Sequence, residues 1–181
     1  DDNMVYPVVV WAHSLHTTAT SPPHFVIGFL EGLLSEHNQS SVTRILTHLG
    51  VSHEFMKLGS DSRFISQGHI SPTTFTKFLL ADEISGLNVW IDVDTVATRG
   101  WDAIFDLIAD SPAEAKLIVA ERGRDATSHA RAIRKPSDLF FNAGVLGWPA
   151  RPRISWSDQL DKVDVVETQE QYLFNSLYAS H

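Results

Sequence analysis

The chain of 181 residues contains no cysteine. This absence excludes disulfide bonds and thiolate zinc sites. It is compatible with a reducing compartment, so we expect a cytoplasmic protein. No apolar run approaches the roughly 20 residues that cross a bilayer, and the sequence therefore predicts no transmembrane segment. The early stretch "MVYPVVVWA" is too short and too lightly charged at its start for a signal peptide.

Basic residues are scarce as well. Lysine and arginine together number 14 against 22 acidic residues, which gives a formal net charge of −8. Domains that bind nucleic acid usually carry a basic stripe. The one basic cluster, "ERGRDATSHARAIRK", is interrupted by acidic and small residues. We interpret it as a mobile surface loop, with the binding of an anionic ligand as the alternative, and we do not expect nucleic acid among the partners.

The remaining composition is that of a globular protein, with 43% hydrophobic and 20% charged residues. A chain of this length has room for one domain with a proper core, so we expect a single domain over residues 1–181. The opening "DDNM" places a methionine only at position 4. This suggests that the chain is a fragment of a longer one.

Segments with strand and helix character alternate along the chain. The patterns predict strands at 6–13, 24–32, 51–58, 88–92, 115–121 and 138–148, and helices at 34–50, 71–84, 101–110 and 167–180. The run "YPVVVWAH" from Tyr6 to His13 is β-branched and apolar, as in a buried parallel strand. Such alternation predicts an α/β fold with a mixed, mostly parallel central sheet and helices on both faces.

Two of the expected helices have clear start signals and apolar faces. Ser35 is a plausible N-cap for the first, Gly50 is a good stop, and Ser71 with Pro72 begins the second. The residues expected to face the core are Val42, Ile45, Leu46 and Leu49 in the first helix and Phe75, Phe78 and Leu79 in the second.

Two acids, Asp92 and Asp94, stand one residue apart where the apolar strand "NVWID" ends. On an extended segment, side chains at i and i+2 point the same way, and the two like charges repel unless a cation lies between them. A hard divalent ion with oxygen ligands fits this pattern. Ligands of open α/β sheets bind beyond the carboxyl ends of strands, which favours a functional site over a solvated turn.

Two chemistries are open for the acid pair. The acids could hold a metal that bridges a nucleotide diphosphate. Alternatively, Asp92 could be a nucleophile and Asp94 a general acid, because "WIDVDTV" resembles the hhhDxDxT/V signature of haloacid-dehalogenase phosphatases. Those phosphatases carry the motif on their first strand and need a later acidic pair. Here the motif is central, and only "WSDQLDKVD" could supply that pair.

Four segments, taken in order, resemble the nucleotide-sugar glycosyltransferases of family 8, the group of glycogenin and the bacterial lipopolysaccharide galactosyltransferases. They are "LSEHNQSSVTRILTHLGVSHEFMKL", "HISPTTFTKFLLADEI", "VWIDVDTVATRGWDAIFDL" and "FFNAGVLGW". "EQYLFN" is a fifth, fainter match. The resemblance covers about residues 34–175 and implies a GT-A-like fold.

The resemblance also implies roles for individual residues. It assigns Asp92 and Asp94 to a manganese or magnesium ion, with Asp92 also touching the ribose. Lys77 stands where the family has an arginine. A lysine there can still pair with a phosphate or a sugar oxygen, but it cannot make the two parallel hydrogen bonds of an arginine. A solvated helix lysine is the alternative for this position.

Further residues follow from the same resemblance. The donor sugar would be framed by Asn142, Ala143 and Gly144, although Asn142 could instead cap a turn. Glu170 and Gln171 match the pair beside the reacting carbon, with glutamate in place of the family's aspartate. His13 and Ser14, at the end of the first expected strand, would touch the base, although a polar loop with two histidines would look the same. The family's C-terminal histidine ligand has no match before His181.

Together these features predict a metal-dependent glycosyltransferase that moves a hexose from a UDP-sugar to a hydroxyl of a saccharide or protein acceptor. The resemblance implies retention at the anomeric carbon. Two alternatives stay open at this point: a phosphohydrolase with Asp92 as nucleophile, and a domain that binds sugar or nucleotide without turnover.

Overall fold

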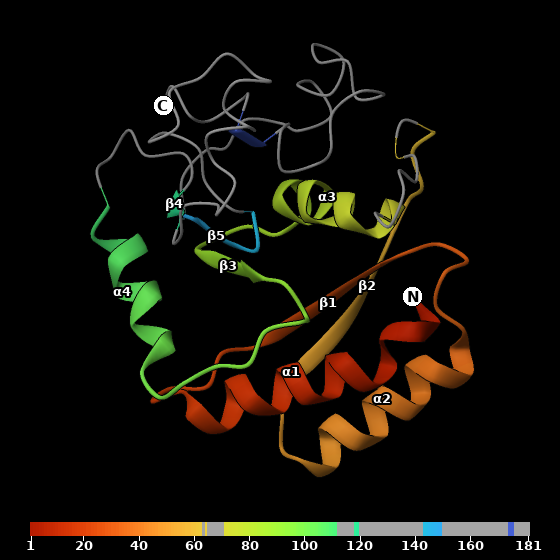
Figure 1. The fold of residues 1–181 in the computed structure, drawn as a ribbon, viewed down its shortest axis with the longest axis horizontal. Helices are drawn as coiled ribbons and strands as arrows, with labels where there is room; N and C mark the ends of the chain where they lie inside the picture. Colours follow the sequence, from red (N-terminus) through yellow and green to blue (C-terminus); the bar gives the residue numbers. More distant parts are fainter. Residues whose placement is uncertain (63, 65–70, 112–117, 120–142, 150–173, 176–181) are drawn as a thin grey trace. The chain divides into compact units, whose positions relative to one another are not determined.

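The structure is a computed structural model that describes residues 1–62, 64, 71–111, 118–119, 143–149 and 174–175. The chain divides into two compact units. The first contains Asp1–Asp61 and Asp92–Asp106, and the second contains Ser62–Ile91 and Leu107–His181. Figure 1 shows the elements of each unit. The expectation of a single domain stays a prediction.

The first unit is built on a parallel pair of strands. Its elements are η1 (Asp2–Met4), α1 (Val5–Thr18), β1 (Phe25–Leu30), α2 (Glu36–His48), β2 (His53–Leu58) and η3 (Trp101–Ala103), followed by the first turn of α4 (Ile104–Ala109). β1 and β2 run parallel in a register that pairs Phe25 with His53 and Leu30 with Leu58. Both strands were expected from their apolar composition.

The predicted strand at 6–13 is wrong, because this segment lies within the helix α1. Its buried residues Val8, Ala12 and Leu15 are four and three positions apart, so they share one helical face. Pro7 is in the first turn, where its missing N–H breaks no helical bond. The burial of this apolar face outweighs the β-propensity of the valine run.

Hydroxyl side chains make the second half of α1 compatible with a helix. Ser14 Oγ donates to Trp11 O at 2.9 Å, Thr17 Oγ1 to His13 O at 2.8 Å, and Thr18 Oγ1 to Ser14 O at 2.6 Å. Each bond returns to a carbonyl three or four residues earlier, as serine and threonine do within helices. The helix therefore continues to Thr18.

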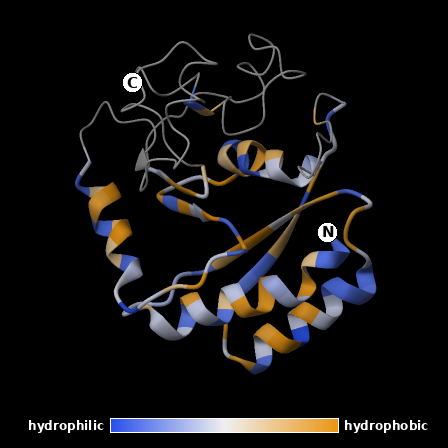
Figure 2. Cartoon of the chain, viewed as in Figure 1, coloured by the Kyte–Doolittle hydropathy of each residue, from blue (hydrophilic) through white to orange (hydrophobic). Residues whose placement is uncertain are grey.

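The signals for α2 are confirmed at both ends. Ser35 Oγ accepts from Asn38 N at 3.3 Å, and Gly50 has a φ of 72° with Val51 N bonded to Leu46 O. Figure 2 shows hydrophobic and hydrophilic residues alternating around this helix.

The apolar face of α2 is narrower than expected. Val42 and Leu46 are buried, but Ile45 is 37% exposed, so the prediction that Ile45 faces the core is wrong. Leu49, predicted to join that face, is half-buried.

The second unit contains η2 (Pro72–Phe75), α3 (Thr76–Glu83), β3 (Asn88–Ile91), β4 (Ile118–Val119) and β5 (Val145–Trp148). Its sheet has the order β3-β5-β4, and both ladders are antiparallel. The described strands of the chain therefore form one parallel ladder and two antiparallel ones. The expected order of helix and strand segments is confirmed for the described elements of this unit, and the described ladders of the chain include both parallel and antiparallel pairs.

An aromatic core holds the second unit together. Ser71 caps η2 by accepting from Thr73 N at 3.3 Å, as its sequence position predicted. The ring centroids of Phe78 and Phe174 are 4.1 Å apart in a stacked pair. The buried members of this core are Phe64, Phe75, Phe78, Ala81, Ala143, Leu146, Trp148 and Phe174, with Leu79 and Trp90 packed against them. Phe75, Phe78 and Leu79 were the predicted core residues of this helix.

In the described part of the chain, no helix combines the length and apolar character that a membrane crossing needs. The longest, α1, has 14 residues.

Asp102 fastens η3 to the turn after α1. Its Oδ2 accepts from Thr20 N at 2.7 Å and from Ser21 N at 3.0 Å. The bond from the Ser21 N–H is the main reason why the pKa of Asp102 is lowered, and the Thr20 N–H acts in the same direction. These bonds stabilise the ionised carboxylate of the folded state.

This lowered pKa predicts a pH dependence of stability. A carboxyl with a lowered folded-state pKa contributes stability above its unfolded pKa of about 3.9, and that stability is lost as the pH falls through the folded value. Asp102→Asn should therefore reduce the free energy of unfolding near neutral pH and flatten its decline between about pH 5 and pH 3. Urea unfolding at several pH values measures both effects. The exposed Asp110→Asn is the control, and parallel pH curves for wild type and Asp102→Asn would contradict the assignment.

Candidate functional site

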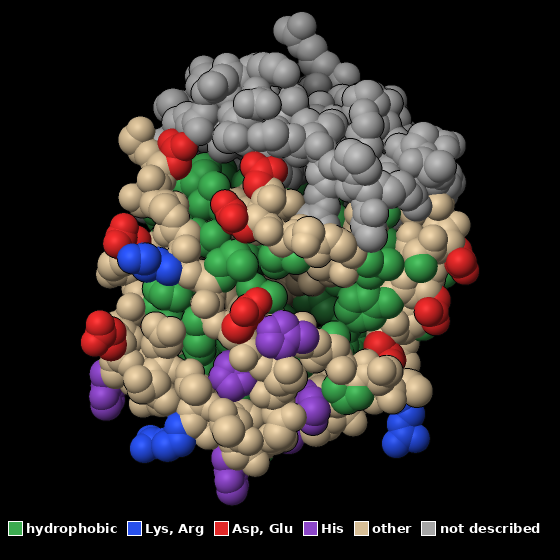
Figure 3. Space-filling model, turned by 180° about the vertical axis from the view of Figure 1, so that it is seen from behind, with side chains coloured by type: hydrophobic (Ala, Val, Ile, Leu, Met, Phe, Trp, Pro, Cys, Tyr) green, Lys and Arg blue, Asp and Glu red, His purple; other side chains and the backbone are tan. Residues whose placement is uncertain are grey.

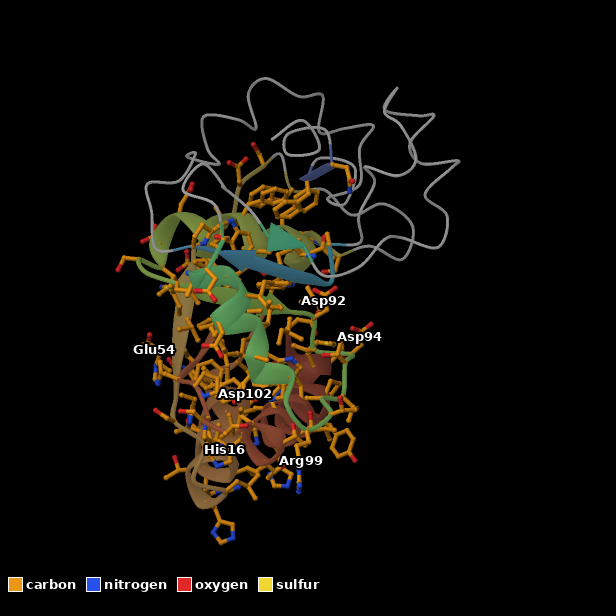
Figure 4. All side chains as sticks on the ribbon, turned by 90° about the vertical axis from the view of Figure 1, so that its left-hand side faces the viewer. His16, Glu54, Asp92, Asp94, Arg99 and Asp102 are labelled. Carbon is orange, nitrogen blue, oxygen red and sulfur yellow. The ribbon has the colours of Figure 1, made fainter. Side chains whose placement is uncertain are left out.

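The acid pair lies in a tight turn directly after β3. The strand ends at Ile91, and the carbonyl of Asp92 accepts from Thr95 N at 3.3 Å and from Thr95 Oγ1 at 2.8 Å. The expected extended geometry is therefore replaced by a turn closed on Asp92. Figure 4 shows Asp92 and Asp94 near each other on the loop that leaves β3. Asp94 is exposed and Asp92 is half-buried.

The loop that carries the acids is fixed against α1. Ala97 N donates to Ser14 Oγ at 3.3 Å, Gly100 N to Thr18 O at 3.4 Å, and Trp101 Nε1 to Leu15 O at 2.9 Å. These bonds begin three residues after Asp94. The segment that follows the acids is thus anchored to α1 within the first unit.

Carboxylate oxygens at such a turn fit a hard divalent ion that keeps ligands from water or substrate. Among the described residues, no group of three histidine, aspartate or glutamate side chains is placed to hold a metal. The pair would therefore supply two ligands. Metal binding stays a prediction.

Few cations surround the acids in the first unit. Its lysine and arginine residues are Arg44, Lys57 and Arg99, and Lys57 is paired with Glu31 at 3.0 Å. On the described surface in Figure 3, lysine and arginine side chains are separated from one another. A diphosphate bound beside the acids would thus find no cluster of basic side chains in this unit. Its charge would have to be neutralised in another way.

His13 and Ser14, the residues expected to touch the base, lie in the last turns of α1. Ser14 Oγ donates to one carbonyl and accepts from Ala97 N, so it connects the helix to the loop after the acids. His13 is exposed, and its carbonyl accepts from Thr17 Oγ1. The structure thus gives Ser14 a supporting position next to the acid loop. Contact of either residue with a base stays a prediction.

Lys77 is 2% exposed and lies in α3 between Thr76 and Phe78, which are buried as well. Its Nζ donates to Ala143 O at 3.2 Å and stands 5.4 Å from the centroid of the Trp90 ring. The alternative of a solvated lysine is therefore wrong. A buried ammonium is unfavourable without partners, and here a carbonyl and an indole face are two of them.

The same contact brings two predicted site residues together. Ala143 is 1% exposed and Gly144 is half-buried. They precede β5, whose first residue Val145 is the register partner of Ile91. Ile91 in turn precedes Asp92. Asp92 therefore follows Ile91 in sequence, Gly144 precedes Val145, and Ile91 and Val145 are paired in the β3–β5 ladder.

Three of the predicted site residues, Asn142, Glu170 and Gln171, lie outside the described residues. The segment "EQYLFN" is described only at its end. There Phe174 and Asn175 are fully buried, and Phe174 stacks on Phe78. The end of this segment therefore belongs to the aromatic core of the second unit.

The sequence did not indicate the contacts of Trp90 and Asp102. Trp90 was expected only as a residue of the strand at 88–92. Its contact with Lys77 joins this strand to a helix that is separate from it in sequence. Asp102 was noted only within a helix start. Its partners, Thr20 and Ser21, lie about 80 positions earlier, so no local pattern could indicate the contact.

The arrangement of helices and strands is that of the GT-A-like α/β class. The structure is similar over 98% of the chain to a crystal structure of an active-site mutant of LgtC, in which a glutamine is replaced by glutamate. The match covers 68% of the LgtC chain, with a TM-score of 0.76 and 21% sequence identity. No protein-family model matches this chain, and neither does the sequence of any curated protein. The predicted fold class is thereby confirmed.

The contribution of the Lys77–Ala143 hydrogen bond to stability can be measured by substitution. Lys77→Met retains an unbranched apolar chain but removes the donor, which leaves the buried carbonyl of Ala143 without this partner. We expect a loss of about 1–3 kcal/mol in the free energy of unfolding, measured with urea. Lys57→Met, at an exposed ion pair, should cost less than about 1 kcal/mol. Equal stability of Lys77→Met and wild type would show that the contact contributes nothing net.

Proposed function

We propose that this chain is a metal-dependent glycosyltransferase that transfers a hexose from a UDP-sugar to a hydroxyl group of a saccharide or protein acceptor. The observation that carries the proposal is the Asp92–Asp94 turn at the exit of β3 in a GT-A-like fold. The similarity to LgtC, a lipopolysaccharide galactosyltransferase, supports the transferase class. No feature of the described structure favours the phosphohydrolase alternative.

In this proposal, Asp92 and Asp94 hold a manganese or magnesium ion. When bound, such an ion neutralises the negative charge that grows on the leaving diphosphate and orients the donor. The scarcity of lysine and arginine within the first unit supports this role for a metal. The exposure of Asp94 leaves room for a substrate oxygen beside its carboxylate.

The residues before β5 are proposed to frame the donor sugar. Lys77 holds the carbonyl of Ala143, so we assign it the role of positioning the segment that contains Asn142 and Gly144. The Asn142 amide would bond sugar hydroxyls, and Gly144 would let the backbone approach the ring. Glu170 and Gln171 would lie beside the reacting carbon. Retention at that carbon rests on the resemblance to family 8.

The metal site is tested by titrating UDP into the protein with and without manganese. Wild type should bind UDP in a manganese-dependent manner, and Asp94→Asn should weaken this binding at least tenfold, since one of two metal ligands is lost. Without metal, the Tm of Asp94→Asn should equal or exceed that of wild type, because the repulsion between two like charges is relieved.

Asp106→Asn, at an exposed position, is the matched control and should bind UDP like wild type. Unchanged manganese-dependent binding in Asp94→Asn would contradict the proposed metal site. A large fall in its metal-free Tm would instead assign Asp94 to the stability of the turn.

The sugar pocket is tested by separating UDP from UDP-hexose. Gly144→Val adds a branched side chain where the donor ring is proposed to approach. We expect near-normal UDP affinity with manganese but strongly reduced turnover of UDP-hexose. Asn142→Ala should lower turnover less, by about 0.5–1.5 kcal/mol for one hydrogen bond to a neutral hydroxyl.

Gly59→Val is the control for a glycine replacement, since a Cβ added at Gly59 meets nothing within 4 Å. Equal losses of UDP and UDP-hexose binding in the folded Gly144 and Asn142 variants would show that this segment is not a sugar pocket.

A further inference from the structure

Three polar side chains meet at the amino ends of β1 and β2. His24 directly precedes β1, Ser52 directly precedes β2, and Glu54 is the second residue of β2. The Nδ1 atom of His24 is hydrogen-bonded to Ser52 Oγ at 2.8 Å, and its Nε2 atom lies 3.6 Å from Glu54 Oε1. All three residues belong to the first unit. None of them has a part in the proposed transfer of a sugar.

The parallel ladder places these side chains on one face of the strand pair. Val26 is the register partner of Glu54, and Phe25 N donates to Ser52 O at 2.9 Å. Ser52 and Glu54 are two positions apart on an extended segment, so their side chains point the same way. His24 reaches this face from the neighbouring strand through its bond to Ser52. The backbone of two paired strands therefore supports the three side chains.

The spacing between His24 and Glu54 fits two ligands of one metal ion. At 3.6 Å, the Nε2 and Oε1 atoms are farther apart than the roughly 2.7–3.2 Å of a hydrogen bond. A tetrahedral zinc ion, with bonds of about 2.0–2.2 Å to nitrogen and oxygen, separates two of its ligand atoms by about 3.4 Å. The side chains are 48% and 57% exposed, so an ion and its water ligands have access to both.

Ser52 orients the imidazole of His24 for this purpose. A histidine that binds a metal through one ring nitrogen usually donates the N–H of the other nitrogen to an oxygen, which fixes the ring and its tautomer. The hydroxyl oxygen of Ser52 is an acceptor of this kind for the Nδ1–H group. The lone pair of Nε2 is then directed to the side on which the carboxylate of Glu54 lies.

The ligand atoms select a different class of ion from the acid pair. An imidazole nitrogen suits Zn²⁺, Ni²⁺ and Cu²⁺, whereas ligand sets made only of oxygen suit Mg²⁺ and Mn²⁺. Among the described residues, no third histidine, aspartate or glutamate is placed to join the two, so water would supply the remaining ligands. Figure 4 shows Glu54 on β2 well apart from Asp92 and Asp94. The two candidate metal sites of the first unit are therefore separate.

We propose that His24 Nε2 and the Glu54 carboxylate form a binding site for a divalent ion of the zinc type (Zn²⁺, Ni²⁺ or Cu²⁺), with Ser52 as a positioning residue. The ion connects the residue that enters β1 to β2, and it binds these ligands only when the two strands are paired. Binding to the folded state alone raises stability. The ion therefore stabilises the first unit and takes no part in the transfer reaction.

The site is tested by calorimetric titration of the protein with Zn²⁺ in excess Mg²⁺, which competes for sites made only of oxygen. His24→Gln and Glu54→Gln should each weaken zinc binding at least tenfold, because each removes one of two protein ligands. His37→Gln and Glu31→Gln change other exposed residues of the first unit and are the matched controls. Both controls should bind zinc like wild type, and zinc should raise their Tm until a chelator is added.

The role of Ser52 is tested separately. Ser52→Ala should weaken zinc binding by roughly tenfold, and Ser52→Thr, which keeps the hydroxyl, should restore it. The ¹⁵N NMR signals of the His24 ring should show a protonated Nδ1 and a metal-bound Nε2 when zinc is present. Equal zinc affinity of His24→Gln, Glu54→Gln and wild type would overturn the proposal. A zinc-bound ring with the proton on Nε2, or an equal loss of affinity in the controls, would overturn it as well.

Discussion

The burial of the Lys77 ammonium is a physical constraint on the second unit. A cation in an aromatic core must meet acceptors, and this need joins α3, which carries Lys77, to the carbonyl of Ala143 and to the face of Trp90. Trp90 and the residues after Ala143 belong to paired strands. One side chain thus relates a helix to both strands of the β3–β5 ladder and fixes the residues that enter β5.

The first unit holds the two acids in a turn in which Asp94 is exposed and Asp92 is half-buried. Asp92 begins a turn closed by Thr95, and the following segment is bonded to α1 through Ser14, Thr18 and Leu15. The path of the chain after the two acids is therefore defined by bonds to α1.

The sequence was informative wherever the signal was local. The caps Ser35 and Ser71, the stop at Gly50 and the strands after them all follow from short-range chemistry, and each is confirmed. The run Tyr6–His13 misled for a physical reason. Three adjacent valines favour a strand, but a helical face spaced at Val8, Ala12 and Leu15 was buried instead.

The residues of the candidate site also differ in how far the sequence predicts them. The acid pair could be found from its position after an apolar strand, whereas the burial of Lys77 depends on contacts 66 residues apart and has no local signature. The tie between Asp102 and Thr20 is equally distant in sequence. Sequence patterns therefore indicate residues whose role follows from their local position, and they do not indicate contacts between residues that are distant in sequence.

The short spacing between the acid turn and its anchor has a consequence for protein engineering. Only Thr95 and Val96 separate Asp94 from Ala97, whose N–H is bonded to Ser14. Thr95 closes the turn, while the side chain of Val96 is 73% exposed. Val96 can therefore be substituted with little loss of packing among the described residues. A loop graft, by contrast, has to preserve the length of this connection.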